Sequence, residues 1–278
     1  MAPNFGRSIS FPLTPARSFS KPSRHVRSVS LPGTTSSHPL LANLHAHIAA
    51  VHSWIQDTES LQAGLANIHA LHAALADILL LPASVAALRC TTSNTCDRLL
   101  DAFLLLANAH QGFQECLLSL RHAAAESGAA LRRGDTGRLA SASRTQRRAE
   151  KDLAGLAALV STVSSKCRRL NLVPISGEEA EIAYALVEAA AASAAASAAV
   201  FSAAASMSST ASSCKKTATF IPAFTTRKVT IPETAEVAMK RLQALEQCFH
   251  DCDGACDLVF RSMVQTRVSL LNIMTPTI

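Results

Sequence analysis

Apolar residues recur every three or four positions along most of the chain, which is the spacing of the buried face of an α-helix. The first such run extends from Leu44 to Leu75 and ends before Pro82. His38-Pro39 precedes it, and proline suits a first helical position because its missing N–H would have no partner there. The pattern predicts an all-α fold, with helices over about 39–81, 95–131, 138–172, 178–210 and 233–274.

The last predicted helix has the most regular spacing. From Leu242 onward, apolar or small residues stand at 242, 245, 249, 252, 256, 259, 263, 266, 270 and 273. This spacing is typical of a coiled-coil-like seam. A helix over 233–274 would span roughly 60 Å at about 1.5 Å per residue. Long helices joined by short breaks predict an elongated antiparallel bundle of about five long helices.

The same pattern divides the chain into four parts. Residues 1–38 contain five prolines and no apolar periodicity, which predicts a disordered basic tail rich in Ser, Arg and Pro. The helical bundle is predicted over 39–213. A linker containing Pro222 and Pro232 follows over 214–232. The segment 233–278 is predicted to form a long C-terminal helix that packs on the bundle.

Composition adds a question about the fourth helix. Apolar residues make up 49% of the chain and aromatic residues only 4%, so the core must be built from small and aliphatic side chains. Residues 189–205 are almost entirely Ala and Ser. Because membrane insertion depends on Leu, Ile, Phe and Val, we predict a helix that packs through small residues. A membrane-associated hairpin or span is the alternative.

The charge is concentrated in the tail. Of the net charge of +6, residues 1–39 supply +5 and contain no acidic residue. Such a tail can contact nucleic acid, an anionic membrane or an acidic protein groove. Phe5, Phe11 and Phe19 are its only aromatic residues, so we predict no nucleic-acid partner. A second basic group surrounds the predicted 134–137 loop, where a solvated helix end is expected and contact with anionic lipid is the alternative.

A motif of the form R-S-x-S-x-P occurs three times in the tail, with a period of ten residues. A basophilic kinase recognises an Arg three residues before the serine by charge-assisted hydrogen bonds. The phosphorylated motif would resemble a ligand of 14-3-3 proteins, in which the phosphate enters a cluster of basic side chains. The predicted phosphorylation and partner-binding residues are Arg7, Ser10 and Pro12, Arg17, Ser20 and Pro22, and Arg27, Ser30 and Pro32.

The spacing of the repeats favours one pair of sites. Ten extended residues span at most about 36 Å, and twenty about twice that. Ser10 and Ser30 are therefore the pair expected to bind a dimeric reader together. Two other interpretations remain: a plastid transit peptide, which is also rich in Ser and Arg and lacks acidic residues, and a duplicated tail without function. The first interpretation predicts a cytoplasmic protein, and the others allow a plastid or membrane location.

The cysteines and histidines are predicted to be structural. None of the eight cysteines lies in a CxxC pair, and no apolar signal peptide precedes them, which indicates free thiols in a reducing compartment. Cys248, Cys252 and Cys256 could present thiolates to a metal, but Cys252 and Cys256 fall on the apolar seam and are expected in the core. Six histidines between 38 and 72 are expected on a solvated or partly packed face. We predict no metal site and no cofactor.

Several segments are similar to a plant-specific family, domain-of-unknown-function family 241, also called the bypass-related family. The strongest match is RSMVQTRVSLLNIMT at 261–275, which resembles that family's closing R-x-[LM]-[IV]-x-T-R-V-S-L-L-N-[IL] pattern. Other matches are ILLLPAS (78–84), DRLLDAFLLLANA (97–109), ALRRGDTGRL (130–139), and RSVSLP followed by His38-Pro39. The resemblance implies a non-enzymatic plant protein linked to root and shoot development.

Motifs of the common enzyme classes are missing from the sequence: it has no P-loop, G-x-S-x-G, H-E-x-x-H or dinucleotide fingerprint. We therefore predict a protein that is not an enzyme. The leading interpretation is a structural or adaptor protein whose tail is phosphorylated by a basophilic kinase and bound by a 14-3-3-type protein. The bundle is expected to bind another helical protein or a second copy of itself. The alternative is a membrane- or plastid-associated protein whose Ala-rich helix or basic loop contacts lipid.

Overall fold

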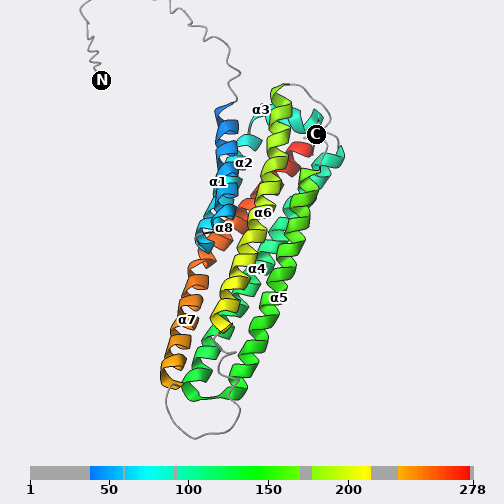
Figure 1. Ribbon diagram of the computed structural model, residues 1–278. Coiled ribbons are helices and arrows are strands. Elements are labelled where there is room, and N and C mark those ends of the chain that lie inside the picture. The colour runs from blue at the N-terminus through cyan, green and yellow to red at the C-terminus, as the bar shows by residue number, and fades with distance from the viewer. Residues whose placement is uncertain (1–37, 59, 91–92, 170–176, 214–230, 276–278) are drawn as a thin grey trace, which may run out of the picture. The chain divides into compact units, whose positions relative to one another are not determined.

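The computed structural model describes residues 38–58, 60–90, 93–169, 177–213 and 231–275. These residues form α-helices and, over the ranges just given, contain no strand, which confirms the all-α fold (Figure 1). Residues from Ser37 onward group into one compact unit. The tail predicted over 1–38, apart from His38, and most of the linker predicted over 214–232 lie outside the described residues.

The first predicted helix is two helices, α1 (Pro39–Gln56) and α2 (Leu61–Leu79). Ser60 caps α2, because its Oγ accepts a hydrogen bond from the backbone N–H of Ala63 at 3.0 Å. A short helix that the sequence pattern did not predict, α3 (Pro82–Cys90), follows at 87° to α2. Pro82 therefore begins a helix as well as ending the preceding pattern, as its preference for a first helical turn allows.

Helices α4 (Ser93–Arg133) and α5 (Thr136–Arg168) form the long antiparallel hairpin of the bundle. Gly134 turns the chain between them with φ +68°, a conformation that suits glycine because it has no Cβ. Asp135 caps α5 by accepting a hydrogen bond at Oδ1 from the backbone N–H of Arg138 at 3.0 Å. The predicted break is thus confirmed at Gly134 and Asp135, whereas Gly137, which was also predicted to break the helix, lies in the first turn of α5.

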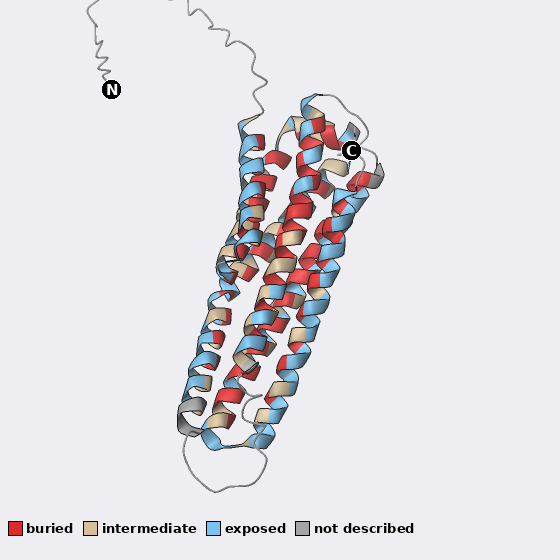
Figure 2. Ribbon diagram, in the orientation of Figure 1, coloured by how far each residue is buried: buried red, intermediate tan, exposed pale blue. Residues whose placement is uncertain are grey.

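Helix α6 (Glu178–Ser213) occupies the centre of the bundle. It packs against α1, α2, α3, α4, α5 and α7 (Figure 1). A helix with neighbours on so many sides has little room for large side chains, which explains its alanines. Residues 189–192 are all at most 4% exposed, and buried positions continue along much of the helix (Figure 2). This confirms the prediction of a helix packed through small residues.

The predicted C-terminal helix is divided into α7 (Ile231–Asp251) and α8 (Asp253–Met274) at the single residue Cys252. Helix α7 packs mainly on α4, whereas α8 packs on both α2 and α4. All but the last of the ten predicted seam positions are buried: Leu242, Leu245, Phe249, Cys252, Cys256, Val259, Met263, Thr266 and Leu270. The seam is therefore confirmed, although the described residues form eight helices where the pattern predicted five.

Candidate functional site

The nine residues predicted for phosphorylation and partner binding, from Arg7 to Pro32, lie outside the described residues. The structure therefore leaves that prediction untested. The described residues offer four other places for function: a basic end of the bundle, a groove between α4 and α5, a chain of buried polar groups, and the junction of α7 and α8.

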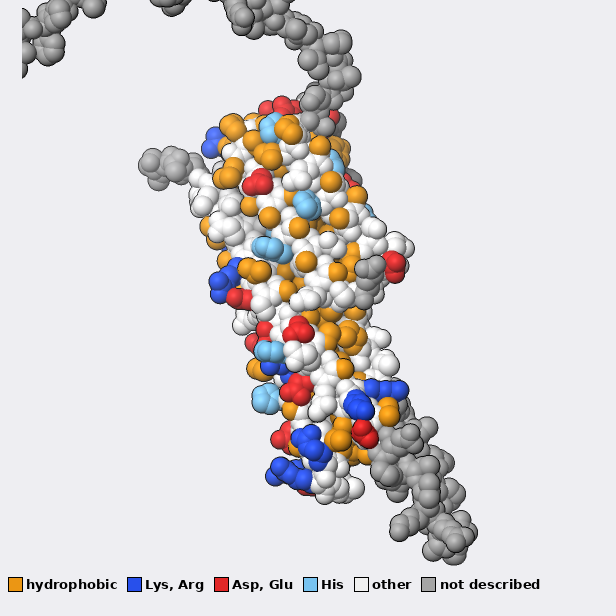
Figure 3. All heavy atoms as spheres, turned by 90° about the vertical axis from the view of Figure 1, so that its left-hand side faces the viewer, with side chains coloured by type: hydrophobic (Ala, Val, Ile, Leu, Met, Phe, Trp, Pro, Cys, Tyr) orange, Lys and Arg blue, Asp and Glu red, His pale blue; other side chains and the backbone are white. Residues whose placement is uncertain are grey.

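Basic side chains gather at the end of the α4–α5 hairpin. Between residues 126 and 152 the sequence has seven Arg or Lys and four Asp or Glu. We use the name basic end for the six exposed cations that make no ion pair with any described residue: Arg132, Arg133, Arg144, Arg147, Arg148 and Lys151. In Figure 3, which shows the side of α1 and α7, most Lys and Arg side chains also lie in the lower part of the molecule.

The carboxylates near the basic end are partly occupied elsewhere. Asp135 lies 3.6 Å from Arg138, the seventh cation of this region. Glu150 accepts hydrogen bonds from Ser208 Oγ at 2.7 Å and from Gln146 Nε2 at 3.1 Å. Because Ser208 lies on α6 and is fully buried, Glu150 is tied to the bundle interior. Glu126 and Asp152 remain as the exposed carboxylates of this region.

A surface groove of about 660 Å³ runs between α4 and α5 beside the basic end. Gly112 and Gly155 contribute to it, and Arg148 and Lys151 line one part of it. Glu115 and Asp152 line it as well, so both signs of charge are present. The mixed lining indicates a groove without selectivity for anions, although Arg148 and Lys151 also belong to the basic end.

A chain of buried polar groups crosses the centre of the bundle. His72 of α2 lies between Thr266 of α8, at 3.0 Å from Nδ1 to Oγ1, and Ser193 of α6, at 2.9 Å from Nε2 to Oγ. Thr266 Oγ1 donates to the carbonyl of Ser262 at 2.9 Å, so it accepts from His72. The network therefore assigns the His72 proton to Nδ1, with Ser193 donating to Nε2.

A second histidine, His110 of α4, makes a similar contact with α6, one helical turn beyond Ser193. Ser197 Oγ donates to the Ser193 carbonyl at 2.8 Å and lies 2.9 Å from His110 Nε2, so His110 donates to Ser197. The imidazole of His110 also lies edge-on to Phe201, with ring centroids 5.1 Å apart. The two histidines thus join α2, α4 and α8 to the central helix α6.

Both imidazoles are held in the neutral form. Burial lowers the pKa of His72 to about 3, with a further contribution from His69. Burial likewise lowers the pKa of His110 to about 3, with a contribution from His72. The exposed fractions of these two side chains are 1% and 0%. A substrate in solvent cannot reach them, so their role is to hold the helices together.

The positions of these histidines correct one expectation. His72 was expected on a solvated or partly packed face, and it is fully buried. His45 is exposed and lies 3.8 Å from Glu188, as that expectation allows. The sequence contained a signal that could have located the buried pair: Ser193 and Ser197 stand four residues apart in a run of alanines. Serines buried on one helix face need hydrogen-bond partners from neighbouring helices.

The thiols near the end of α7 are part of the core. Cys252 and Cys256 are each 1% exposed, which confirms their predicted packing. Burial, with smaller contributions from neighbouring Cys and Asp side chains, raises the pKa of both thiols to about 12. A metal ligand or nucleophile needs the thiolate, which this environment disfavours. Among the described residues, no three His, Cys, Asp or Glu side chains are placed to hold a metal ion.

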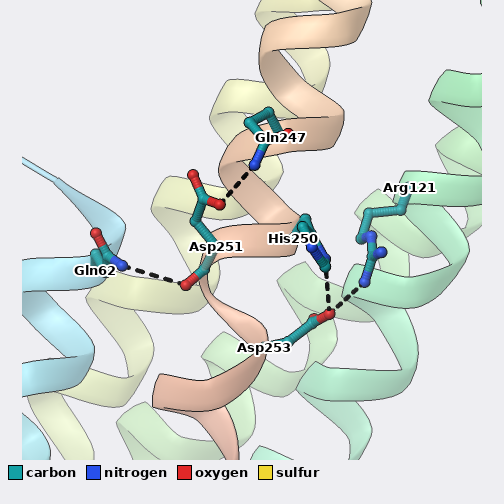
Figure 4. A network of polar contacts seen from close by, with 6 residues as sticks. All are labelled: Gln62, Arg121, Gln247, His250, Asp251 and Asp253. Carbon is teal, nitrogen blue, oxygen red and sulfur yellow. Dashed lines mark hydrogen bonds and ion pairs between the residues drawn. The ribbon is translucent and has the colours of Figure 1, made fainter.

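The junction of α7 and α8 carries a polar network (Figure 4). Gln62 of α2 donates to the Asp251 carbonyl at 3.2 Å, and Gln247 donates to the Asp251 carboxylate at 2.7 Å. Asp253 at the start of α8 pairs with Arg121 of α4 and lies 3.5 Å from His250 Nδ1. These contacts hold the junction against α2 and α4, which explains why the seam continues through the break.

By length and composition alone, the described residues contain one helix that could span a membrane, Glu178–Ala211, or two if the bent pair α2–α3 counts as a span. In the bundle, 72% of the apolar window of Glu178–Ala211 is buried. The core helix of a soluble protein passes the same test of length and composition. The burial accounts for this helix without a membrane.

The comparison with protein families gives a match over residues 64–273, to the family described as Protein BPS1. The chain belongs to this family. The match confirms the resemblance seen in the sequence motifs, and it extends from α2 to the last residues of α8. No curated protein and no solved structure matches the chain.

The closing motif of this BPS1-family chain now has a structural explanation. Its Met263 and Leu270 are buried seam residues. Its Thr266 receives the hydrogen bond from His72. The motif therefore anchors the last helix to α2 across the centre of the bundle. The buried residues of the motif therefore serve the fold, whereas Val264 and Val268 of the same motif are partly exposed.

Proposed function

We propose that this BPS1-family chain is a non-enzymatic adaptor of plant development that acts in the cytoplasm. In this proposal a helical bundle carries an N-terminal tail that, once phosphorylated, is bound by a 14-3-3-type protein. The role in root and shoot development comes from the family resemblance. The observation that carries the adaptor mechanism is the threefold R-S-x-S-x-P repeat, with Ser10, Ser20 and Ser30 as phosphate acceptors.

The chemistry of the bundle interior supports a role without catalysis. Four strongly perturbed titratable groups, His72, His110, Cys252 and Cys256, are buried in packed surroundings. Cys116 and Cys167 line surface grooves, but burial raises the pKa of each thiol to about 11, which disfavours the reactive thiolate. Perturbed groups in an active site face a cleft that a substrate can enter. Both ring nitrogens of His72 and Nε2 of His110 are used in contacts between helices, and His110 Nδ1 is buried without a hydrogen-bond partner among the described residues.

A phosphoserine carries a charge of roughly −2, and 14-3-3-type readers bind it with clustered basic side chains. Three sites at intervals of ten residues would let one chain occupy both grooves of a dimeric reader. We propose Ser10 and Ser30 as the pair that binds together, because the intervening chain gives the longest reach. Arg7, Arg17 and Arg27 supply the contact that a basophilic kinase recognises.

The test uses the full-length protein phosphorylated by a basophilic kinase, with binding to a purified 14-3-3 protein as the readout. The triple variant Ser10→Ala, Ser20→Ala, Ser30→Ala should lose binding. Each repeat also supplies a matched control, because the triple variant Ser8→Ala, Ser18→Ala, Ser28→Ala removes the first serine and keeps the second. Binding that survives in the first variant, or a native protein that lacks the repeats, would refute the adaptor mechanism.

The outer face of α8 supports a second contact, with a helical partner or with another copy of the chain. Val264 and Val268 stand four residues apart on one face of α8 and are 39% and 40% exposed. Sedimentation of the full-length protein over a range of concentrations distinguishes self-association from binding to a different protein.

A further inference from the structure

We propose that the basic end of the bundle docks on an anionic phospholipid surface. This contact goes beyond the adaptor function, because it uses the bundle and does not involve the phosphorylated tail. The proposal rests on three observations: the position of the cations, the absence of ion pairs to described residues that would neutralise them, and the absence of Phe, Tyr and Trp from residues 126–152.

The cations of the basic end occupy a limited stretch of surface. Arg132 and Arg133 lie in the last turn of α4, directly before the Gly134 turn. On α5, Arg144, Arg148 and Lys151 follow the i, i+4, i+7 spacing of one helix face. The buried face of α5 at this point is formed by Ala142, Gln146 and Ala149, so the cations lie on the outer side. At about 1.5 Å per residue, all six lie within roughly 25 Å of the turn.

Arg89, Lys166, Arg168 and Arg169 are also exposed without an ion pair to a described residue, whereas other cations on the described surface are paired within the protein. Arg121 pairs with Asp253, Lys240 with Glu236 at 2.9 Å, and Arg261 with Asp257 at 2.7 Å. At the basic end, none of the six cations has such a partner among the described residues. The nearby carboxylate of Glu150 is directed toward Ser208 of α6. The result is a local excess of positive charge that an external anion can neutralise.

The form of this surface favours lipid over the other polyanions. Single-stranded nucleic acid is bound by aromatic side chains that stack on the bases. The segment 126–152 has no Phe, Tyr or Trp, and the Phe residues of α4 and α6 are buried in the core. Long Arg and Lys side chains without ion pairs, spread over the exposed end of the α4–α5 hairpin, suit a surface of diffuse charge. Each Lys or Arg near an anionic leaflet contributes about a fivefold factor in binding.

Two variants of the full-length protein test the proposal. The first neutralises the basic end through Arg132→Gln, Arg133→Gln, Arg144→Gln, Arg147→Gln, Arg148→Gln and Lys151→Gln. The second neutralises the tail through Arg7→Gln, Arg17→Gln, Lys21→Gln, Arg24→Gln and Arg27→Gln, and it keeps every serine. Both keep the four cations of 214–230, which lie outside the described residues. Circular dichroism checks the fold of each variant, since the first set of side chains is exposed and glutamine favours helix.

Binding is measured by cosedimentation with vesicles of phosphatidylcholine alone and of phosphatidylcholine with phosphatidylserine. The unmodified protein should bind only the anionic vesicles, and higher salt should release it. The first variant should bind at least about 100-fold more weakly, because the loss of only three contacts worth about fivefold each already gives that factor, whereas the tail variant should retain most of its binding. The proposal is wrong if the unmodified protein does not bind anionic vesicles, or if the tail variant loses binding and the first variant keeps it. It is also wrong if the basic end binds duplex DNA as tightly as it binds anionic vesicles. Failure of 14-3-3 binding would leave this result unchanged, so the two proposals fail separately.

Discussion

The indole of Trp54 lies directly over Gly64, at the place where α1 and α2 pack together. Trp54 is 6% exposed, and its Nε1 donates a hydrogen bond to the Ser60 carbonyl at 3.3 Å. A Cβ added at Gly64 would overlap the six-membered part of the indole ring. The glycine is therefore required by the close approach of the ring. Together with the cap at Ser60, this contact fixes the turn that divides the first predicted helix into two.

Replacing Gly64 with alanine should lower the free energy of unfolding by about 1–2 kcal/mol. Displacing the indole costs about 1–3 kcal/mol, and the gain in helix propensity offsets up to about 1 kcal/mol of that. Trp54 is the one tryptophan of the chain, so its fluorescence during denaturation reports the change directly. Gly155→Ala is the control, because nothing lies within 4 Å of the added Cβ and the substitution should stabilise the helix. A Gly64→Ala variant as stable as the control would show that the indole moves without strain.

At the scale of elements, the spacing of apolar residues predicted the faces of the helices better than their ends. The seam from Leu242 to Leu270 was readable because the same side of the chain stays buried through both α7 and α8. The break at Cys252 was not readable, since the apolar spacing continues across it. It depends on contacts from distant segments, such as Gln62 with Asp251 and Arg121 with Asp253.

The sequence shows the residues of the basic end and of the histidine network, but not the distant partners that decide their charge and burial. The cations of the basic end are visible in the sequence, but their lack of partners is not. Whether Glu150 neutralises them depends on Ser208, which is 58 residues away in the chain. The buried state of His72 depends on Thr266, which is 194 residues away. A pattern read along one segment cannot report such partners.

Helix α6 supplies the element-scale prediction, because its alanines fit the space between several neighbours. Ala194 is fully buried, whereas Ser202 on the same helix is exposed. Ala194→Leu should lower the free energy of unfolding by about 1–3 kcal/mol, since the larger side chain overfills the core. Ser202→Leu should have little effect on unfolding measured by circular dichroism. If α6 instead left the bundle to enter lipid, leucine at either position would strengthen membrane association in a vesicle-binding assay.

The whole bundle is held together at its centre by two neutral imidazoles. His72 connects α2, α6 and α8, and His110 connects α4 to α6. Protonation of either ring would place a charge among apolar side chains such as Phe103 and Phe201. The folded protein therefore binds these protons only in strong acid, whereas the unfolded chain binds them near the ordinary histidine pKa of about 6.5. This difference makes the stability of the entire bundle depend on pH.

The free energy of unfolding should fall as the pH drops from about 6.5 toward 3. In that window the unfolded chain binds one more proton per buried histidine than the folded chain does, because the folded pKa values are about 3. Each histidine then contributes a slope of about 1.4 kcal/mol per pH unit. Stability increases with pH from the folded pKa of about 3 to the unfolded histidine pKa of about 6.5, and then levels off. Denaturant unfolding at a series of pH values measures this slope. His110→Gln should reduce it by about one histidine's share, while the exposed His122→Gln should leave it unchanged. An unchanged slope in His110→Gln would mean that carboxylates alone govern the acid sensitivity of the bundle.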